Sequence, residues 1–360
     1  NMKKILQAVL SLLCIACLFL LSGCSESNVA KVEEEPILLS MPEEEGIFID
    51  EIGENSLLLV RLNTDYGFED YLNKGASSLE DQLKYFDESG IVYHQNLMKL
   101  SAPNCTTFTA KNGSGEYIYG RNNDWVAEDT IIVLYTKPRN GYASVSITDG
   151  VYFGYENENV GSDEIKKYML SAAYFPCDGI NEKGVVIASN SVHSTPEVDP
   201  EKTTIGSFQA TRLILDYAKN VDEAIELFKK YNIYFINPEL ESHYLISDAS
   251  GKSVIVEFIN QEMRVIEPNQ PWQVNTNFAL CHFEEEEDAF GACPRFKNAF
   301  NYLKKKNGIL ESNESFEILK KTSQSITLYS AVYNNTNGDI KLATRKNFDR
   351  IFNFKLDMAN

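Results

Sequence analysis

Two β-forming segments on either side of a short polar loop constrain the fold of this chain more than any other feature of its sequence. Residues 105–110 (Cys-Thr-Thr-Phe-Thr-Ala) and 116–120 (Glu-Tyr-Ile-Tyr-Gly) are rich in strand-forming residues. Residues 111–115 (Lys-Asn-Gly-Ser-Gly) between them are typical of a turn. We therefore predict a β-hairpin at this point of the chain.

The predicted hairpin brings a thiol close to two charged groups. A turn centred on Gly113 places Arg121 opposite Cys105, and the Cβ atoms of cross-strand partners lie about 5 Å apart. Asp124 follows the second strand, where a loop can bring its carboxylate back to the same thiol. Because a nearby guanidinium favours thiolate over thiol, Cys105 is a candidate nucleophile. The alternative is an ordinary buried cysteine beside a surface arginine.

The residues of this hairpin resemble the nucleophile region of a known family. Cys105 begins the stretch Cys-Thr-Thr-Phe, and Arg121 and Asp124 lie in Gly-Arg-Asn-Asn-Asp-Trp, 16 and 19 residues further on. These motifs are similar to those of the choloylglycine hydrolase family, N-terminal-nucleophile amide hydrolases that include bile salt hydrolases, penicillin V acylases and, more distantly, acid-ceramidase-like enzymes. The resemblance covers residues 105–360 and implies an α+β fold, the four-layer αββα sandwich.

Two further motifs nominate oxyanion-hole residues through the same resemblance. Residues 177–184 (Cys-Asp-Gly-Ile-Asn-Glu-Lys-Gly) resemble a family segment whose next strand ends in such a residue. In this chain that residue is Asn190 or, one position on, Ser191. A later Asn-Thr-Asn-Phe stretch nominates Asn277, with Asn275 as the rival by register. The alternative for Asn190 is a strand-end residue that caps a loop.

A second arginine and the implied reaction complete the site. Arg295 lies in Cys-Pro-Arg-Phe at the start of a helix predicted to end near Lys306, and it resembles the family's second arginine near the nucleophile. The family's chemistry is amide hydrolysis through a thioester. The freed α-amine of Cys105, with a reference pKa of about 8, would take the thiol proton. Asp124 would orient that amine, Arg121 would stabilise the thiolate, and the two asparagines would hold the oxyanion.

The start of the chain has the features of an exported lipoprotein. Two lysines precede an apolar run, residues 5–21, which is short for a stable transmembrane helix. Residues 21–24 (Leu-Ser-Gly-Cys) resemble the bacterial lipobox, which implies removal of a signal peptide, residues 1–23, and a lipid on Cys24. We expect an extracytoplasmic protein that is anchored to the bacterial cell membrane. An ordinary signal peptide with a chance cysteine is the alternative.

A long segment separates the lipid site from the nucleophile. Residues 24–45 read as an acidic linker, and residues 46–104 as a prosegment with strands in residues 47–62 followed by a helix. An N-terminal nucleophile requires a backbone cut before Cys105. The prosegment resembles that of the ceramidase-like branch, which is cut autocatalytically and retained. Residues 105–360 then form the hydrolase domain.

The amino-acid composition and net charge limit the partners that this protein can bind. A chain that is 43% hydrophobic and 11% aromatic can form a large core, and a net charge of −19 argues against nucleic acid or anionic lipid as a partner. The four histidines are scattered and no Cys/His group has the spacing of a zinc site, so we expect no metal or cofactor. The expected partner is a small N-acyl amide such as a bile salt, penicillin V, an N-acyl amino acid or an N-acyl lactone. A homo-oligomer stays open.

Three cysteines, Cys177, Cys281 and Cys293, remain once Cys105 is assigned as the nucleophile. Of the pairings that export would allow, we consider only a disulfide between Cys281 and Cys293.

Two other functions stay open. An acyltransferase would use the same acyl-enzyme but pass the acyl group to an amine. A non-catalytic ligand-binding surface lipoprotein is favoured if Cys105 resists alkylation and no cut occurs.

Hydrophobic periodicity places the remaining elements. Two amphipathic helices are predicted over residues 207–219 and 221–231, with Asn220 at their join. Strands are predicted over residues 130–137, 142–148, 185–190, 243–247, 253–259, 272–280, 327–333 and 339–344.

Overall fold

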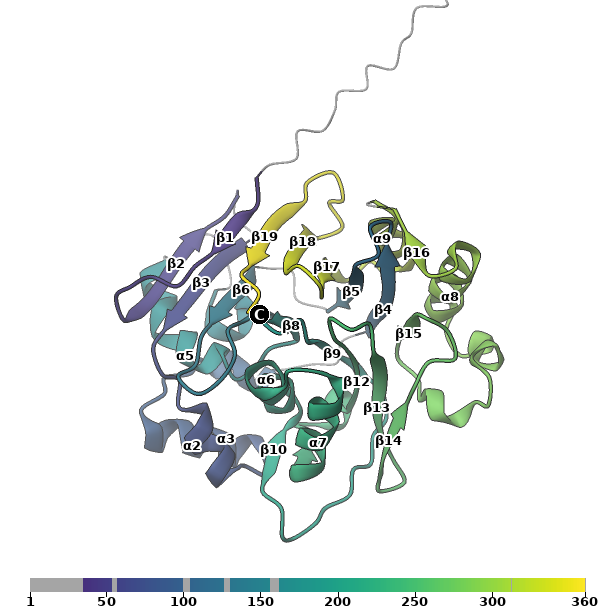
Figure 1. Cartoon of the computed structure of the whole chain (residues 1–360). Helices are drawn as coiled ribbons and strands as arrows, with labels where there is room; N and C mark the ends of the chain where they lie inside the picture. The colour runs from purple at the N-terminus through teal and green to yellow at the C-terminus, as the bar shows by residue number, and fades with distance from the viewer. Residues whose placement is uncertain are drawn as a thin grey trace, which may run out of the picture. The chain divides into compact units, whose positions relative to one another are not determined.

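Two β-sheets packed face to face occupy the centre of the fold (Figure 1). The structure is a computed structural model that describes residues 35–53, 57–99, 104–125, 130–155, 162–311 and 313–359. Sheet A contacts sheet B where β4 meets β9 and β12, and where β15 meets β13. The large hydrophobic core lies between and around the two sheets.

Sheet A contains the predicted hairpin near one edge. Its strands follow the order β1 (Ile37–Leu39), β19 (Phe352–Leu356), β18 (Asp339–Thr344), β17 (Thr327–Asn334), β5 (Tyr117–Asp124), β4 (Asn104–Asn112) and β15 (Gln273–Asn275). A short strand, β16 (Ile309–Leu310), also pairs with β4. The hairpin β4–β5 therefore has strands from the C-terminal part of the chain on both sides.

Sheet B supplies the opposite wall. Its strands follow the order β14 (Glu262–Ile266), β13 (Ser253–Ile259), β12 (Ser242–Ser247), β9 (Val186–Ser191), β8 (Asp178–Asn181), β7 (Ser144–Asp149), β6 (Ile131–Thr136), β3 (Leu57–Asn63) and β2 (Gly46–Glu51). A separate two-stranded sheet joins β10 (Thr204–Gly206) to β11 (Asn232–Tyr234). The predicted strands over residues 130–137, 142–148 and 185–190 are thereby confirmed to within a few residues.

Helices cover the outer face of each sheet. On sheet B, α6 (Ser207–Tyr217) contacts β8 and β9, and α7 (Val221–Lys230) contacts β12 and β13. On sheet A, α8 (Pro294–Lys306) contacts β4 and β15, and α9 (Glu314–Thr322) contacts β5 and β17. The layers run helix, sheet, sheet, helix, so the α+β four-layer αββα prediction is confirmed.

The predicted prosegment is built into sheet B. Strand β3 pairs with β6 in parallel and β2 pairs with β3 in an antiparallel register, so sheet B continues into this segment (Figure 1). Residues 57–60 form a continuous apolar run, Leu-Leu-Leu-Val, because both faces of β3 are buried. The prosegment is thus part of the folded core. Strand β1 lies in the predicted linker and pairs with β19 in sheet A, so that part of residues 24–45 is a strand of the fold.

Helices of the prosegment add an aromatic contact surface. They are α2 (Phe68–Lys74) and α3 (Leu79–Ser89), followed by a 3-10 turn, Gln95–Lys99. Ser78 caps α3, since its hydroxyl accepts a hydrogen bond from Asp81 N at 3.1 Å. Aromatic rings of this segment lie 4.9–6.5 Å from the ring of Tyr174; they are Tyr66, Phe68, Tyr71, Tyr85 and Phe86. These contacts bind the prosegment to the rest of the chain.

Short helices α4 (Ser162–Ile165) and α5 (Met169–Ala172) lead into β8.

The two predicted helices around Asn220 are confirmed as α6 and α7, and the Asn220 side chain caps α7 by accepting a hydrogen bond from Glu223 N at 2.9 Å. The strand predicted over residues 272–280 is too long, because only Gln273–Asn275 pairs with β4. The prediction also missed helices α2, α4, α5 and α9 and strands β1, β8, β10, β11, β14, β16 and β19.

Several sequence predictions concern residues outside the described ranges. The signal peptide, the lipid site Cys24 and the first half of the linker fall in residues 1–34, so they stay predictions. In the part of the chain that the structure describes, no helix has the length and apolar character needed to cross a bilayer. The predicted disulfide between Cys281 and Cys293 is wrong, since both thiols are free.

Candidate active site

The β4–β5 hairpin forms, but its turn is centred one residue later than predicted, so each residue pairs two positions further along the partner strand. Cys105 pairs with Asn123, and Arg121 pairs with Thr107. The side chain of Asn112 causes the shift, because its Oδ1 accepts from Ser114 N and Glu116 N and thereby centres the turn one residue later.

Gly120 helps to fix this register. It pairs with Phe108, whose ring lies where a side chain at position 120 would begin: a Cβ there would come within 2.2 Å of the ring. Only glycine leaves room for that ring.

Arg121 nevertheless reaches the thiol, because its side chain points into the space between the sheets on the same face as Cys105. Its Nη2 lies 3.3 Å from Cys105 Sγ, and both side chains are fully buried. The other end of the guanidinium donates to Ser189 O at 2.9 Å and Asn190 Oδ1 at 3.2 Å. The predicted closeness of the thiol and the guanidinium is confirmed. The two residues are not direct cross-strand partners, and the contact forms because the long Arg121 side chain extends to the thiol.

Asp178 is the counterion of Arg121, and the sequence analysis had not nominated it. Its carboxylate forms an ion pair with Arg121 Nε and accepts hydrogen bonds from the hydroxyls of Tyr329, at 2.5 Å, and Tyr333. Burial raises the pKa of Asp178, while the Arg121 charge and the two hydroxyls oppose that rise. Asp178 is the second residue of the motif at residues 177–184, so that motif already contained the residue that pairs with Arg121.

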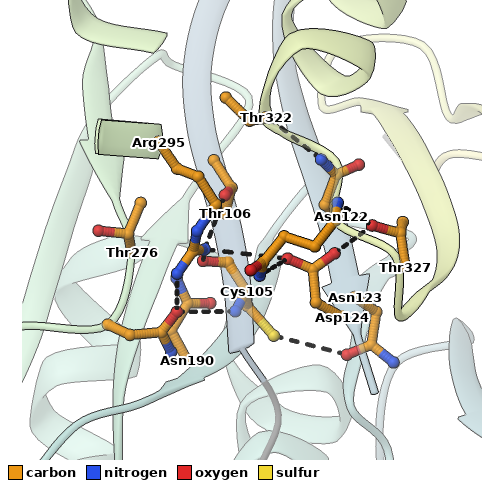
Figure 2. A network of polar contacts seen from close by, with 12 residues as sticks. Cys105, Thr106, Asn122, Asn123, Asp124, Asn190, Thr276, Arg295, Thr322 and Thr327 are labelled. Carbon is orange, nitrogen blue, oxygen red and sulfur yellow. Dashed lines mark hydrogen bonds and ion pairs between the residues drawn. The ribbon is translucent and has the colours of Figure 1, made fainter. Parts of the chain in front are cut away.

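Asn123 is the second residue that sequence reasoning missed. Its Oδ1 lies 3.6 Å from Cys105 Sγ and accepts a hydrogen bond from Arg121 Nη2 at 2.8 Å (Figure 2). Side chains alternate along a strand, so residues 121 and 123 share a face, and the correct register would have placed Asn123 beside the thiol.

The charge state of Cys105 depends on opposing effects. Burial raises the pKa of the Cys105 thiol, and the Arg121 charge lowers it but does not outweigh burial. Asp124 adds a smaller rise. In the uncut chain, therefore, the thiol keeps its proton at neutral pH.

Asn190 lies against the guanidinium, on β9. It is fully buried, and its Nδ2 donates to Thr107 Oγ1 at 3.2 Å while its Oδ1 accepts from Arg121. The rival position, Ser191, uses its backbone carbonyl to accept from Asn277 Nδ2 at 2.8 Å. The structure thus brings Asn190 to the site by its side chain and Ser191 by its backbone.

Asn277 and Arg295 hold the backbone of Cys105 at both ends. Asn277 Oδ1 accepts from Cys105 N at 2.8 Å, and Arg295 Nη1 donates to Cys105 O. Arg295 Nη2 also donates to Asn277 Oδ1 at 2.9 Å, which joins the two residues. The rival Asn275 lies on β15 opposite Thr107, buried beside the site.

Asp124 lies on the other face of the hairpin from the thiol. It pairs with Asn104, one position from the Cys105–Asn123 pair, so strand alternation points its carboxylate toward the α8–α9 side. The carboxylate accepts from Thr327 Oγ1 at 2.5 Å and from Gln324 Nε2 at 2.7 Å (Figure 2). Its distance to Arg295 Nη1 is 3.9 Å.

The described residues around Cys105 do not form a set of metal ligands. Within the ranges that the structure describes, no three His, Cys, Asp or Glu side chains gather closely enough to hold an ion. The arrangement instead offers a thiol, a buried guanidinium and a clamped backbone nitrogen, which are groups for nucleophilic acyl chemistry.

The segment that links Asn277 to Arg295 carries a buried carboxyl group, Glu286. Its side chain is 8% exposed, and burial together with the charges of Glu287 and Glu285 raises its pKa to about 7 from an ordinary 4.5. The folded chain therefore binds more protons between those two pH values, and its free energy of unfolding falls as pH rises through them.

Replacing Glu286 with glutamine should remove that penalty. At pH 8 we expect the variant to be more stable by up to about 2 kcal/mol, after allowance for solvent screening, and at pH 4 to match the wild type. Chemical denaturation at the two pH values measures this difference. Glu226→Gln, which removes an exposed carboxylate paired with Lys229 at 2.7 Å, is the control and should change stability by about 0.5 kcal/mol or less at either pH. Equal stability of Glu286→Gln and wild type at pH 8 would contradict the expectation.

The segment that contains most of the site residues matches a known family. Residues 105–281 match the family described as linear amide C-N hydrolases, choloylglycine hydrolase family. The chain is 27% identical over 183 residues to the bile salt hydrolase/transferase of Clostridium perfringens, a match that covers 46% of this chain and 51% of that protein. It is 26% identical over 178 residues to the penicillin V acylase of Pectobacterium atrosepticum, covering 44% and 45%. Each match spans about half the length of the relative.

Solved structures show the same fold. A conjugated bile acid hydrolase variant from Clostridium perfringens aligns with a TM-score of 0.54 and 19% identity, over 71% of this chain and 93% of that one. The penicillin V acylase from Agrobacterium tumefaciens aligns with a TM-score of 0.52 and 20% identity, over 71% and 88%. The match begins at the candidate nucleophile and the layers have the same arrangement, and residues 105–281 of this chain match the choloylglycine hydrolase family of linear amide C-N hydrolases.

Proposed function

We propose that this protein is a cysteine amidase that hydrolyses the amide bond of a small N-acyl substrate through a thioester. One observation carries the proposal: the sulfur and the backbone nitrogen of Cys105 are held in one site, the sulfur 3.3 Å from Arg121 Nη2 and the nitrogen 2.8 Å from Asn277 Oδ1. A nucleophile and its own proton acceptor thereby belong to the same residue.

Activation requires a cut between Asn104 and Cys105. In the uncut chain Cys105 N is an amide, which cannot accept a proton, and the thiol is fully buried. In the proposed step, Sγ attacks the Asn104 carbonyl carbon, the C–N bond breaks, and the nitrogen takes the thiol proton. Water then hydrolyses the resulting thioester, leaving the Asn104 carboxylate and a free thiol beside a free α-amine.

Turnover repeats this chemistry on the substrate. The α-amine, held by Asn277, takes the thiol proton, and the thiolate beside Arg121 attacks the substrate carbonyl carbon. The ammonium returns the proton to the leaving amine as the C–N bond breaks. Water, deprotonated by the same amine, then releases the acid from the thioester.

Asparagine and aspartate side chains have supporting roles in this scheme. Asn190 is proposed to donate one N–H of its Nδ2 to the oxyanion, while the other donates to Thr107 Oγ1 at 3.2 Å. Asn277 is proposed to donate to the oxyanion in the same way, since Ser191 O takes only one of its two N–H groups, and its Oδ1 in addition holds the Cys105 nitrogen at 2.8 Å. Asp124, 3.9 Å from Arg295, is proposed to set the charge beside that amine. Export and a lipid on Cys24 stay part of the proposal.

Processing offers a direct test. Mature protein should run as two pieces on a denaturing gel, and mass spectrometry should find Cys105 as a new N-terminus. The pieces should co-elute under native conditions, because β2 and β3 of the prosegment belong to sheet B. The processed protein should hydrolyse at least one amide in a panel of bile salts, penicillin V, N-acyl amino acids and N-acyl lactones. A single intact band with full amidase activity would contradict the scheme.

The acyltransferase alternative shares the acyl-enzyme. The relative from Clostridium perfringens carries both hydrolase and transferase in its name. Adding an amine such as taurine or glycine to the assay separates the two outcomes, because a transferase forms a new amide while a hydrolase forms only the acid.

A further inference from the structure

A buried histidine, His243 on β12, lies behind the site with an acceptor at each ring nitrogen. Its Nδ1 is 2.9 Å from Glu257 Oε1, and its Nε2 is 2.8 Å from Thr276 O. A backbone carbonyl can only accept, so Nε2 is the nitrogen that donates to Thr276 O. His243 thereby links Glu257 to the backbone of residue 276.

Glu257, on β13, is ionised in this arrangement. Burial on its own raises the pKa of Glu257, but the hydrogen bond and charge of His243 and the N–H of Leu280 outweigh burial and lower the pKa to about 2. Its carboxylate also accepts from Leu280 N at 2.8 Å and Cys281 N at 3.1 Å. Burying an ion pair costs stability unless its hydrogen bonds are complete, and here the backbone completes them.

The three backbone contacts of this pair bracket Asn277. Thr276 O is fixed by His243 on one side, and Leu280 N and Cys281 N are fixed by Glu257 on the other. Between them, Asn277 extends its Oδ1 to Cys105 N and to Arg295. The sheet B register also sets His243 beside Asn190 on the neighbouring strand.

We propose that the His243–Glu257 ion pair is a positioning device that holds residues 276–281 so that Asn277 can bind the nitrogen of Cys105. The inference rests on the proposed function, in which that nitrogen becomes the proton-relaying amine. Neither residue of the pair contacts Cys105 in the hydrogen bonds described, so both act through Asn277.

The chain contains a matched control pair on its surface. His193 Nδ1 lies 2.6 Å from Glu241 Oε2, with the histidine side chain 82% exposed. Glu241→Gln removes the same chemical group from a histidine–glutamate pair that does not contact residues 276–281, so it serves as the control for Glu257→Gln.

Hydrogen exchange tests the inference without any need for turnover. In the uncut Cys105→Ala chain, Glu257→Gln should raise the exchange rate of the residue 105 amide about tenfold or more, because that amide is bonded to Asn277 Oδ1. Glu241→Gln should leave the rate unchanged. An unchanged exchange rate of the residue 105 amide would overturn the inference even if the amidase is active.

Steady-state kinetics provide a second test of the same inference. In the processed enzyme, Glu257→Gln should lower kcat about 10- to 100-fold and leave KM within about twofold, as expected for a group that orients a reacting residue. If the pair acts through Asn277, then Glu257→Gln should have no further effect on kcat in an Asn277→Ala background. Multiplying effects in the double variant would overturn the inference. Should no amide be hydrolysed by wild type, the proposed function fails, and the exchange arm still decides the inference.

Discussion

Replacing Cys105 with alanine should abolish both the cut before residue 105 and the hydrolysis of N-acyl amides. The variant lacks the sulfur that forms the thioester in each reaction, and the loss in kcat should be about 10⁴-fold or more. A denaturing gel should show one uncut chain, and an assay on the substrate panel should show no product above background.

Cys281→Ala is the control for thiol removal. The Cys281 thiol forms no disulfide, is half-buried and hydrogen-bonds Glu257, while the Cys281 backbone N–H, which also donates to Glu257 at 3.1 Å, is kept in the alanine variant. This variant should be cut and should turn over substrate at the wild-type rate to within about twofold. Persistent activity in Cys105→Ala, with or without a cut, would rule out the proposed mechanism.

Replacing Arg121 with glutamine should lower the free energy of unfolding by about 3–5 kcal/mol at pH 7. The change removes the cation that faces Asp178, whose carboxylate is then buried between two tyrosine hydroxyls without a counterion. An uncompensated Asp178 will take up a proton more readily, so the deficit should shrink as pH falls toward 4 and grow as it rises. Chemical denaturation across this pH range measures the effect.

A surface arginine provides the comparison. Arg264 pairs with Glu262 at 2.6 Å, and both side chains are about half exposed, so Arg264→Gln should cost no more than about 1 kcal/mol. Adding Asp178→Asn to Arg121→Gln should restore part of the lost stability, because the second change removes the unpaired charge. A loss below about 1 kcal/mol in Arg121→Gln would contradict the role assigned to this ion pair.

The hairpin shows how much of the site local sequence could predict. Alternating strand residues around a Gly-rich loop predicted β4 and β5 and brought Cys105 near Arg121. The turn centre was wrong by one residue, because the prediction took Gly113 as the centre while the Asn112 side chain closes the turn around Ser114. The pairing is therefore shifted by two residues, which puts Asn123 opposite the thiol and keeps Arg121 on the same face.

Other parts of the site depend on contacts between distant segments. Asp178 is 57 positions from Arg121 in the sequence, and the tyrosines that complete its hydrogen bonds come from β17. The roles of Asn277 and Arg295 came only from family resemblance, and the structure gave them a specific task at the Cys105 backbone. Periodicity cannot predict such contacts, since it describes only how one element meets its immediate surroundings.

The sequence by itself determined the β-hairpin, the two helices around Asn220, the α+β class and the closeness of Cys105 to Arg121, because turn residues, caps and motif spacing act over a few positions. Only the tertiary structure decided that the prosegment completes sheet B, that Asp178 balances Arg121, and that the His243–Glu257 pair brackets Asn277. Those arrangements arise where two sheets close over one another and every buried charge must find a partner, a condition that no local stretch of sequence can specify.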